Sequence, residues 1–463
     1  MLRFCSLLLL AVPLLGAEGA IEQIDWLIAA RYVVPMDAAR SVIENGAVAV
    51  RGERIVAVGP RAELARRYQP RHTVDRGEAI LTPGLINTHT HAAMSLLRGI
   101  ANDVRLEDWL NNFIFPAEKK FVSREFVRQG TELACLEMML SGTTTFTDMY
   151  YFEDEAALAA KSAGMRGVLG ETVIRFPVAD AATPADALRY AEGFIARFKN
   201  DPLIVPAVAP HALYTNADAD LQASRALANK YHVPLLIHLS ETQKENRDTQ
   251  SARGMSPTRV LESLGVLDGI TVAAHAIWVD AGDLAVLQRH HTGLAHCPSS
   301  NMMLASGTAQ VTQWLRAGVD AGLGTDGPAG SNNDFDLMEE MDLAAKLQKL
   351  STGDPTSLPA RQAFAMATIG GARVLGMQKE IGSLEAGKRA DLIAITLEHS
   401  TGVPLYDVYA QLVYALKGSD VRDVMVNGRW IVNDHRSLTL DQPLVLTRAR
   451  EWGQRIQKGL AKH

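Results

Sequence analysis

Two histidines stand two positions apart in the stretch LTPGLINTHTH, residues 81–91. An apolar run leads into His89 and His91, and in a β-strand the side chains at positions i and i+2 point to the same side. At the carboxyl end of a strand, both imidazole rings could therefore bind one metal ion. A single His-x-His pair is weak evidence for a metal site, so further ligands are needed elsewhere in the chain.

Residues of similar chemistry follow other apolar runs, namely His211, His238, Glu241, His275 and Asp326. Imidazole nitrogens and carboxylates, with one position left open for water, are the ligands of catalytic zinc-type sites. Four groups can form such a cage: His89, His91, His238 and Asp326. This choice leaves His275 free to hydrogen-bond the water.

The chemistry that such a site supports is hydrolysis. A bound metal ion would lower the pKa of a water ligand to roughly neutral. Asp326 can accept the proton of that water as a general base. Glu241 comes three residues after His238, on the same rim, and can protonate the leaving side of the electrophile or a ring nitrogen.

The apolar runs alternate with amphipathic helical patterns, which predicts a parallel sheet with helical crossovers. Besides the strand that ends at His89, strands are expected at 143–149, 167–173, 203–209, 234–239, 269–274, 292–296 and 319–324. Eight strands are the number that closes a (β/α)8 barrel, whose active site lies at the carboxyl ends of the strands. The expected fold class is therefore α/β, with a TIM-like barrel.

Short β segments flank the barrel region on both sides, and the later one contains an Asn-Gly hairpin signal at residues 427–428. We expect the two chain ends to pair into one small β-sandwich. The predicted domains are residues 20–82 for the first part of the sandwich, 83–375 for the barrel, 376–440 for the second part, and 441–463 for a C-terminal helix.

Residues 1–19 are predicted to be a signal peptide. Arg3 precedes an apolar run from Leu7 to Leu15, and small residues follow the run. The run is too short to span a bilayer stably. We expect export to the periplasm or the exterior, with cleavage after Ala17 or Gly19. The alternatives are an uncleaved anchor and a wrongly assigned start.

The composition restricts the kind of partner. The chain has 463 residues, of which 47% are hydrophobic and 21% charged, as in an ordinary soluble globular protein. Its formal net charge of −6 argues against nucleic acid or an anionic membrane as the main partner, because both favour basic clusters. We expect a small-molecule substrate and, after signal removal, no membrane partner.

The motifs, in their order, resemble a known family. They are PGLINTHTHAAMSLLRG, HLSET at 238–242, AHAIWVD at 274–280, GLGTDG at 322–327 and IGSLEAGKRADLIAI at 381–395. Together they resemble the amidohydrolase superfamily, and most closely its methylthioadenosine/S-adenosylhomocysteine deaminases, which are related to triazine chlorohydrolases. The resemblance implies the same four metal ligands, a water-polarising His275 and a proton-shuttling Glu241.

The fourth strand indicates one metal ion rather than two. His211 stands where two-metal relatives carry a carboxylated lysine. The resemblance also implies that His211 and Glu118 contact the sugar of a nucleoside. Zinc is the expected ion, although iron, nickel and manganese accept the same ligands. Relatives are often dimers or larger, which leaves a homodimer or a higher homo-oligomer open for this chain.

Glu171 departs from the family pattern. Members that act on S-adenosylhomocysteine hold its amino-acid tail with arginines after the third strand, and Glu171 corresponds to one of those positions. A carboxylate there would repel the carboxylate of the tail. We therefore expect methylthioadenosine, adenosine or 5′-deoxyadenosine as substrate, in preference to S-adenosylhomocysteine.

The expected reaction is hydrolytic deamination of an aromatic amine, above all the 6-amino group of an adenosine-type nucleoside, with release of ammonia. One alternative is hydrolysis of another C–N or C–Cl bond, as in pterin, nucleobase or triazine hydrolases. A more distant alternative is a non-catalytic binding module. The complete ligand set, together with Glu241, argues against that last alternative.

Overall fold

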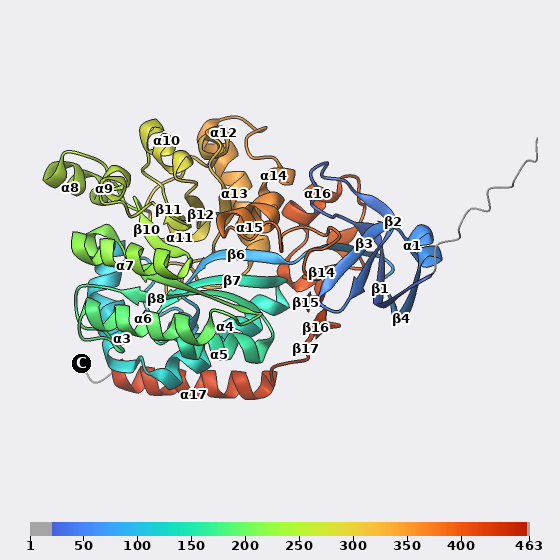
Figure 1. Ribbon diagram of the computed structural model, residues 1–463, viewed down its shortest axis with the longest axis horizontal. Coiled ribbons are helices and arrows are strands. Elements are labelled where there is room, and N and C mark those ends of the chain that lie inside the picture. The colour runs from blue at the N-terminus through green and yellow to red at the C-terminus, as the bar shows by residue number, and fades with distance from the viewer. Residues whose placement is uncertain (1–20, 461–463) are drawn as a thin grey trace, which may run out of the picture.

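The computed structural model describes residues 21–460, so the predicted signal peptide lies outside the described residues. Eight parallel strands form a closed barrel in the order β10-β11-β12-β13-β6-β7-β8-β9. Figure 1 shows this barrel from the side. In chain order they are β6 (Leu85–Thr90), β7 (Thr143–Tyr150), β8 (Arg166–Val173), β9 (Ile204–Pro210), β10 (Leu235–Leu239), β11 (Thr271–His275), β12 (Gly293–His296) and β13 (Ala321–Leu323). The predicted (β/α)8 barrel is confirmed.

Helices connect the strands and cover the outside of the barrel. The longer ones are α4 (Arg124–Leu140), α5 (Glu153–Ala163), α6 (Pro184–Phe198), α7 (Asp218–Tyr231), α8 (Gln243–Arg253), α10 (Ala281–Arg289) and α13 (Leu337–Thr352). Helix α4 illustrates how local sequence sets the bounds. The Ser123 hydroxyl accepts a hydrogen bond from the backbone N–H of Phe126 at its start. Gly142, with φ of +95°, follows its end.

Segments from both chain ends build a second sheet beside the barrel (Figure 1). It contains β1 (Glu22–Val33), β2 (Ile43–Arg51), β3 (Arg54–Pro60), β4 (Tyr68–Asp75), β5 (Ala79–Pro83), β14 (Leu392–Thr396), β15 (Val421–Val426), β16 (Arg429–Asn433) and β17 (Arg436–Ser437). The predicted β-structure from the two ends is confirmed, as one continuous nine-stranded sheet. Antiparallel pairing of β5 with β14 joins the two ends.

The passage from this sheet into the barrel occurs at Gly84, between β5 and β6. A Cβ atom on Gly84 would lie 2.2 Å from the Thr144 side chain, so only glycine fits there. The apolar run that ends at His89 is therefore two strands, one in each sheet. His89 lies near the end of β6, and His91 directly follows it.

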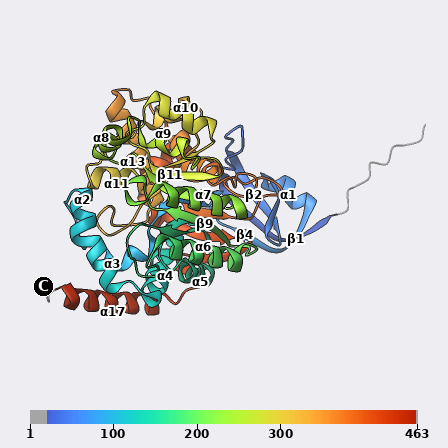
Figure 2. The ribbon, with the colours of Figure 1, turned by 60° about the vertical axis from the view of Figure 1, so that its left-hand side comes forward.

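The C-terminal helix α17 (Gln442–Leu460) lies along α4 on the outside of the barrel, as Figure 2 also shows. Trp452 packs edge-on against Phe126, with ring centroids 5.3 Å apart. Its indole N–H donates to the side-chain oxygen of Gln129 at 2.8 Å. In the described part of the chain, residues 21–460, the helices are too short or too polar to cross a membrane.

Candidate active site

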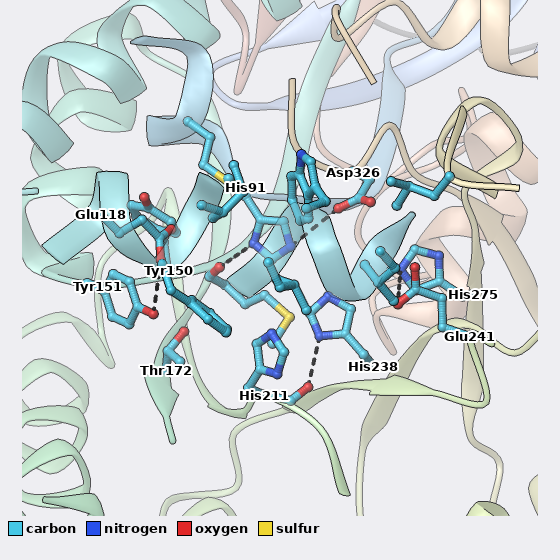
Figure 3. Close-up of a pocket in the computed structure, with 18 of the residues that line it drawn as sticks. His91, Glu118, Tyr150, Tyr151, Thr172, His211, His238, Glu241, His275 and Asp326 are labelled. Atoms are coloured by element: carbon cyan, nitrogen blue, oxygen red, sulfur yellow. Dashed lines mark hydrogen bonds and ion pairs between the residues drawn. The ribbon is translucent and has the colours of Figure 1, made fainter. Parts of the chain in front are cut away.

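The carboxyl ends of the barrel strands bring the predicted residues to one cavity. His91 follows β6, His238 lies in β10, His275 ends β11 and Asp326 follows β13. They share one end of the barrel because parallel strands point in the same direction. All four line the cavity together with Glu118, His211 and Glu241. In Figure 3, His275 and Glu241 lie on one side of it, and Glu118 on the other.

Five donor groups converge as a metal site requires. The ligand atoms of four of them lie within 4.8 Å of one another: His89, His238, His275 and Asp326. His91 belongs to the same cluster, because its Nε2 lies 3.3 Å from Asp326 Oδ1, as does the Nε2 of His89. Five donors exceed the four of a tetrahedral site, so one imidazole can contact water instead.

The buried nitrogen of His89 shows that the cluster fits a metal ion. Its Nε2 has no hydrogen-bond partner among the described residues, and the side chain is 5% exposed. A buried polar atom normally has a partner, and a divalent cation would provide one here. Burial lowers the pKa of His89 to about 4, which keeps the ring neutral, the form that binds metals.

The second ring nitrogen of three histidines is fixed by an acceptor. The pairs are His91 Nδ1 with Met149 O at 2.7 Å, His238 Nδ1 with His211 O at 2.8 Å, and His275 Nδ1 with Asn301 Oδ1 at 3.0 Å. Because each of these acceptors is an oxygen, Nδ1 carries the ring hydrogen in the neutral form. Nε2 then has a free lone pair, which is turned toward the cluster. This is the arrangement that metal-binding histidines use.

Asp326 is held in place from both sides. Its backbone N–H donates to the carbonyl of His89 at 3.0 Å, and its Oδ2 accepts from the Ser300 hydroxyl at 2.6 Å. Its φ of +63° is unusual for a non-glycine residue. Burial alone would raise the pKa of Asp326, but the adjacent imidazole rings of His89, His91 and His275 hold it well below its ordinary value. The carboxylate is therefore ionised and able to accept a proton.

Glu241 lies after a sharp turn at the end of β10, where Ser240 has a φ of +48°. The carboxylate of Glu245 holds this turn by accepting from the backbone N–H groups of Glu241 at 2.8 Å and Ser240 at 3.2 Å. Burial raises the pKa of Glu241. A raised pKa suits a carboxyl group that must carry a proton to a substrate.

Glu118 and His211, the residues expected to contact a sugar, both line the cavity. Glu118 comes from helix α3 (Phe115–Phe121), and the Tyr151 hydroxyl donates to its Oε2 at 3.4 Å. Burial raises the pKa of Glu118 to about 7 and lowers that of His211 to about 3. His211 is therefore neutral at ordinary pH, whereas Glu118 changes its charge near neutral pH, and both can hydrogen-bond a polar ligand.

Glu171 does not reach the cavity. It is fully buried, and its Oε2 accepts from the backbone N–H of Glu153, the first residue of α5. The next residue of β8, Thr172, lines the cavity instead. Successive strand residues point to opposite sides, so Glu171 faces the outer helices. The predicted repulsion of a substrate carboxylate by Glu171 therefore has no basis in the geometry.

Residues that the sequence did not point to also contact the predicted groups, namely Glu245, Ser300, Asn301 and Ser306. The last three follow β12. The Ser306 hydroxyl donates to Glu241 Oε1 at 3.5 Å, and His275 Nε2 lies 3.9 Å from Glu241 Oε2. The only sequence signal is the polar run Ser299–Asn301, which begins three residues after the end of β12.

Comparison with known proteins identifies the family. The model of the amidohydrolase family matches residues 80–431, which is more than half of the chain, so this protein belongs to the amidohydrolase family. A second model, an imidazolonepropionase-like composite domain of bacteria, matches residues 46–68 within the nine-stranded sheet. The resemblance expected from the motifs is confirmed.

Curated relatives cover nearly the whole chain. A 5-methylthioadenosine/S-adenosylhomocysteine deaminase of Thermodesulfovibrio yellowstonii is 44% identical over 93% of this chain and 99% of its own. A protein of the same name from Syntrophus aciditrophicus is 44% identical over 95% of this chain and 99% of its own.

Solved structures share the architecture. An adenosine deaminase from Xanthomonas campestris with bound zinc has a TM-score of 0.92 and 39% identity, over 94% of this chain and 99% of its own. An atrazine chlorohydrolase from Arthrobacter aurescens has a TM-score of 0.85 at 24% identity, over 92% of this chain and 99% of its own. The second likeness concerns the fold alone.

Proposed function

We propose that this protein is a metal-dependent deaminase that hydrolyses the 6-amino group of an adenosine-type nucleoside and releases ammonia. The proposal rests on one observation: a single cavity holds both the group of five side chains that could bind a metal ion and a buried carboxyl group, Glu241. The names of the relatives that are 44% identical over nearly the whole chain support the same reaction.

The metal ligands in this proposal are His89, His91, His238 and Asp326. A bound divalent ion would lower the pKa of a water ligand toward neutrality. Zinc is the proposed ion, because nitrogen and carboxylate donors suit it and the adenosine deaminase from Xanthomonas campestris contains it.

The side chains of this chain then manage the protons. The attacking water forms a bond to the ring carbon, and Glu241 gives its proton to the adjacent ring nitrogen. His275 orients the water through its bare Nε2, which lies 3.9 Å from Glu241 Oε2. Asp326, ionised in the structure, accepts one proton of the water and delivers it to the departing amine as the C–N bond breaks. The remaining proton of the added hydroxyl group passes to Glu241 as the carbonyl forms, which restores the neutral carboxyl group.

The substrate is proposed to carry a sugar, because Glu118 and His211 present hydrogen-bonding groups to the cavity. Methylthioadenosine, adenosine and 5′-deoxyadenosine fit this proposal. S-adenosylhomocysteine joins them, since the buried position of Glu171 removes the reason for excluding its tail.

Export and assembly are further proposals. The charged start and short apolar run of residues 1–19 support export to the periplasm or the exterior. Fractionation of cells that express the full chain would test this. A homodimer or higher homo-oligomer is proposed because relatives are often dimers or larger. Sedimentation would measure the oligomeric state.

The test is ammonia release by the zinc-loaded mature protein with adenosine, methylthioadenosine, S-adenosylhomocysteine, adenine, guanine, cytosine, a pterin and a triazine. We expect strong release from adenosine-type nucleosides and little from adenine. If no amine released ammonia with metal present, the result would contradict deamination and favour hydrolysis of another C–N or C–Cl bond. The Glu241→Gln variant serves as the control for a contaminating deaminase.

A further inference from the structure

One short segment contacts all three groups that the proposed reaction uses to handle protons. Within the segment 300–306, the Ser300 hydroxyl donates to Asp326 at 2.6 Å and the Ser306 hydroxyl donates to Glu241 at 3.5 Å. The side-chain oxygen of Asn301 accepts from His275 Nδ1 at 3.0 Å. All six side chains are buried, so water does not compete for these hydrogen bonds.

The location of the segment in the barrel explains its reach. Strand β12 lies between β11, which ends with His275, and β13, which precedes Asp326. The end of β12 itself carries none of the proposed catalytic residues. The chain that leaves β12 therefore emerges between two catalytic groups and can contact both from helix α11 (Pro298–Met303).

The segment is anchored at both ends. Directly before its start, the backbone N–H of Ser299 donates to Glu340 Oε2 at 3.1 Å. At its end, the indole N–H of Trp278 donates to the carbonyl of Ser306 at 2.8 Å. A Cβ atom on Gly307 would lie 2.9 Å from the Trp278 ring, so the loop packs closely on the residues after β11. These contacts allow the segment to hold the catalytic groups in fixed positions.

We propose that Ser300–Ser306 is a single positioning segment and that Asn301 fixes the tautomer of His275. An amide oxygen can only accept a hydrogen bond. His275 must then carry its hydrogen on Nδ1 and present a bare Nε2 to the centre of the site. The roles of the three contacted groups rest on the proposed function, whereas the tautomer of His275 does not.

The tautomer is measured by NMR of the zinc-loaded full chain labelled with ¹⁵N-histidine, with the signal of His275 assigned from its loss in His275→Gln. We expect the Nδ1-protonated pattern in the wild type and its loss in Asn301→Leu, which has a similar size but no acceptor. The turnover number of Asn301→Leu should fall roughly 10- to 100-fold, the usual effect of removing such a supporting contact, with KM and zinc content within about twofold of the wild type.

Asn301→Asp keeps an acceptor oxygen in place and should restore both the Nδ1-protonated pattern and most of the turnover. This variant also distinguishes positioning from mere stability, because a structural role alone would not depend on the acceptor. An Nε2-protonated His275 in the wild type would overturn the proposal. So would an unchanged pattern in Asn301→Leu.

Ser300→Ala has a matched control in Ser256→Ala. Ser256 lies before helix α9 (Pro257–Ser263), and its hydroxyl donates to Asp283 in helix α10, also at 2.6 Å. Both variants should lose similar thermal stability, but only Ser300→Ala should lose turnover, by roughly tenfold or more. Equal turnover in the two variants would overturn the role of the segment. If the wild type released no ammonia while the NMR pattern was as expected, the proposed function would fail and the tautomer assignment would stand.

Discussion

Replacing Glu118 by glutamine should make the protein more stable at pH 8. Burial raises the pKa of Glu118 from the ordinary value of 4.5 to about 7, although the nearby hydroxyl groups of Tyr150 and Tyr151 oppose this. Below pH 4.5 the carboxyl group is neutral in both the folded and the unfolded chain, and the protein loses no stability. As the pH rises to 7, the unfolded chain ionises first, so the free energy of unfolding falls. Above pH 7 the loss is complete and constant.

The size of the effect follows from the two pKa values. A tenfold change in proton affinity corresponds to about 1.4 kcal/mol, so a rise from 4.5 to about 7 destabilises the folded protein at pH 8 by about 3 kcal/mol. Glutamine has the same shape and no charge. The free energy of unfolding of Glu118→Gln should therefore exceed that of the wild type by about 3 kcal/mol at pH 8, and the two should approach each other toward pH 4.5.

Urea unfolding of the zinc-loaded proteins between pH 5 and 8 would measure this difference. The matched control is Glu125→Gln, because the Glu125 side chain is 57% exposed and lies at the start of the next helix, α4. Its difference from the wild type should be small at every pH. A difference for Glu118→Gln that did not change with pH would refute the idea that burial raises the pKa of this carboxyl group.

The same variant tests the sugar contact. At pH 8 the Glu118 carboxyl group is ionised, and loss of a hydrogen bond to a charged group changes a binding free energy by about 1.5–3 kcal/mol, so kcat/KM for adenosine should fall roughly 10- to 100-fold at this pH. Any activity on adenine, which has no sugar, should stay the same. An equal loss of activity on both compounds would contradict a contact between Glu118 and the sugar.

Three further predictions concern the proposed metal ligands and the buried carboxyl groups. Glu241→Gln should keep its metal by elemental analysis and lose roughly 10²- to 10⁴-fold in turnover by ammonia release; full activity would remove Glu241 from the mechanism. A chelator should abolish ammonia release and lower the midpoint of thermal unfolding, and zinc should restore both, because a ligand of the folded state stabilises it; an unchanged midpoint would argue against a metal at the histidine cluster. Glu171→Gln should leave the ratio of activities on S-adenosylhomocysteine and methylthioadenosine unchanged, since Glu171 is buried outside the cavity. A changed ratio would show that Glu171 influences the choice of substrate.

Much of this protein could be predicted from its sequence because the signals are local. The period of two in a strand places His89 and His91 on one side. Alternation of apolar runs and amphipathic helices predicts the barrel, and the direction of parallel strands gathers the strand ends at one mouth. These rules brought His238, His275 and Asp326 to the same site without knowledge of the packing.

The side that Glu171 faces was decided only by the tertiary structure. All eight residues of β8 are buried, so the pattern of apolar residues does not show which side points into the barrel. The resemblance to the family suggested a substrate contact for Glu171, but its side chain accepts a hydrogen bond from the start of α5. Its neighbour Thr172 lines the cavity instead.

The supporting contacts also depend on the tertiary structure. Ser300 and Asn301 each contact a partner 26 residues away in the chain, and Ser306 contacts one 65 residues away. No periodicity joins such positions, because the contacts arise where β12 emerges between its two neighbours in the closed barrel. The sequence determined which groups could do the chemistry, and barrel closure decided which side chains hold them in position.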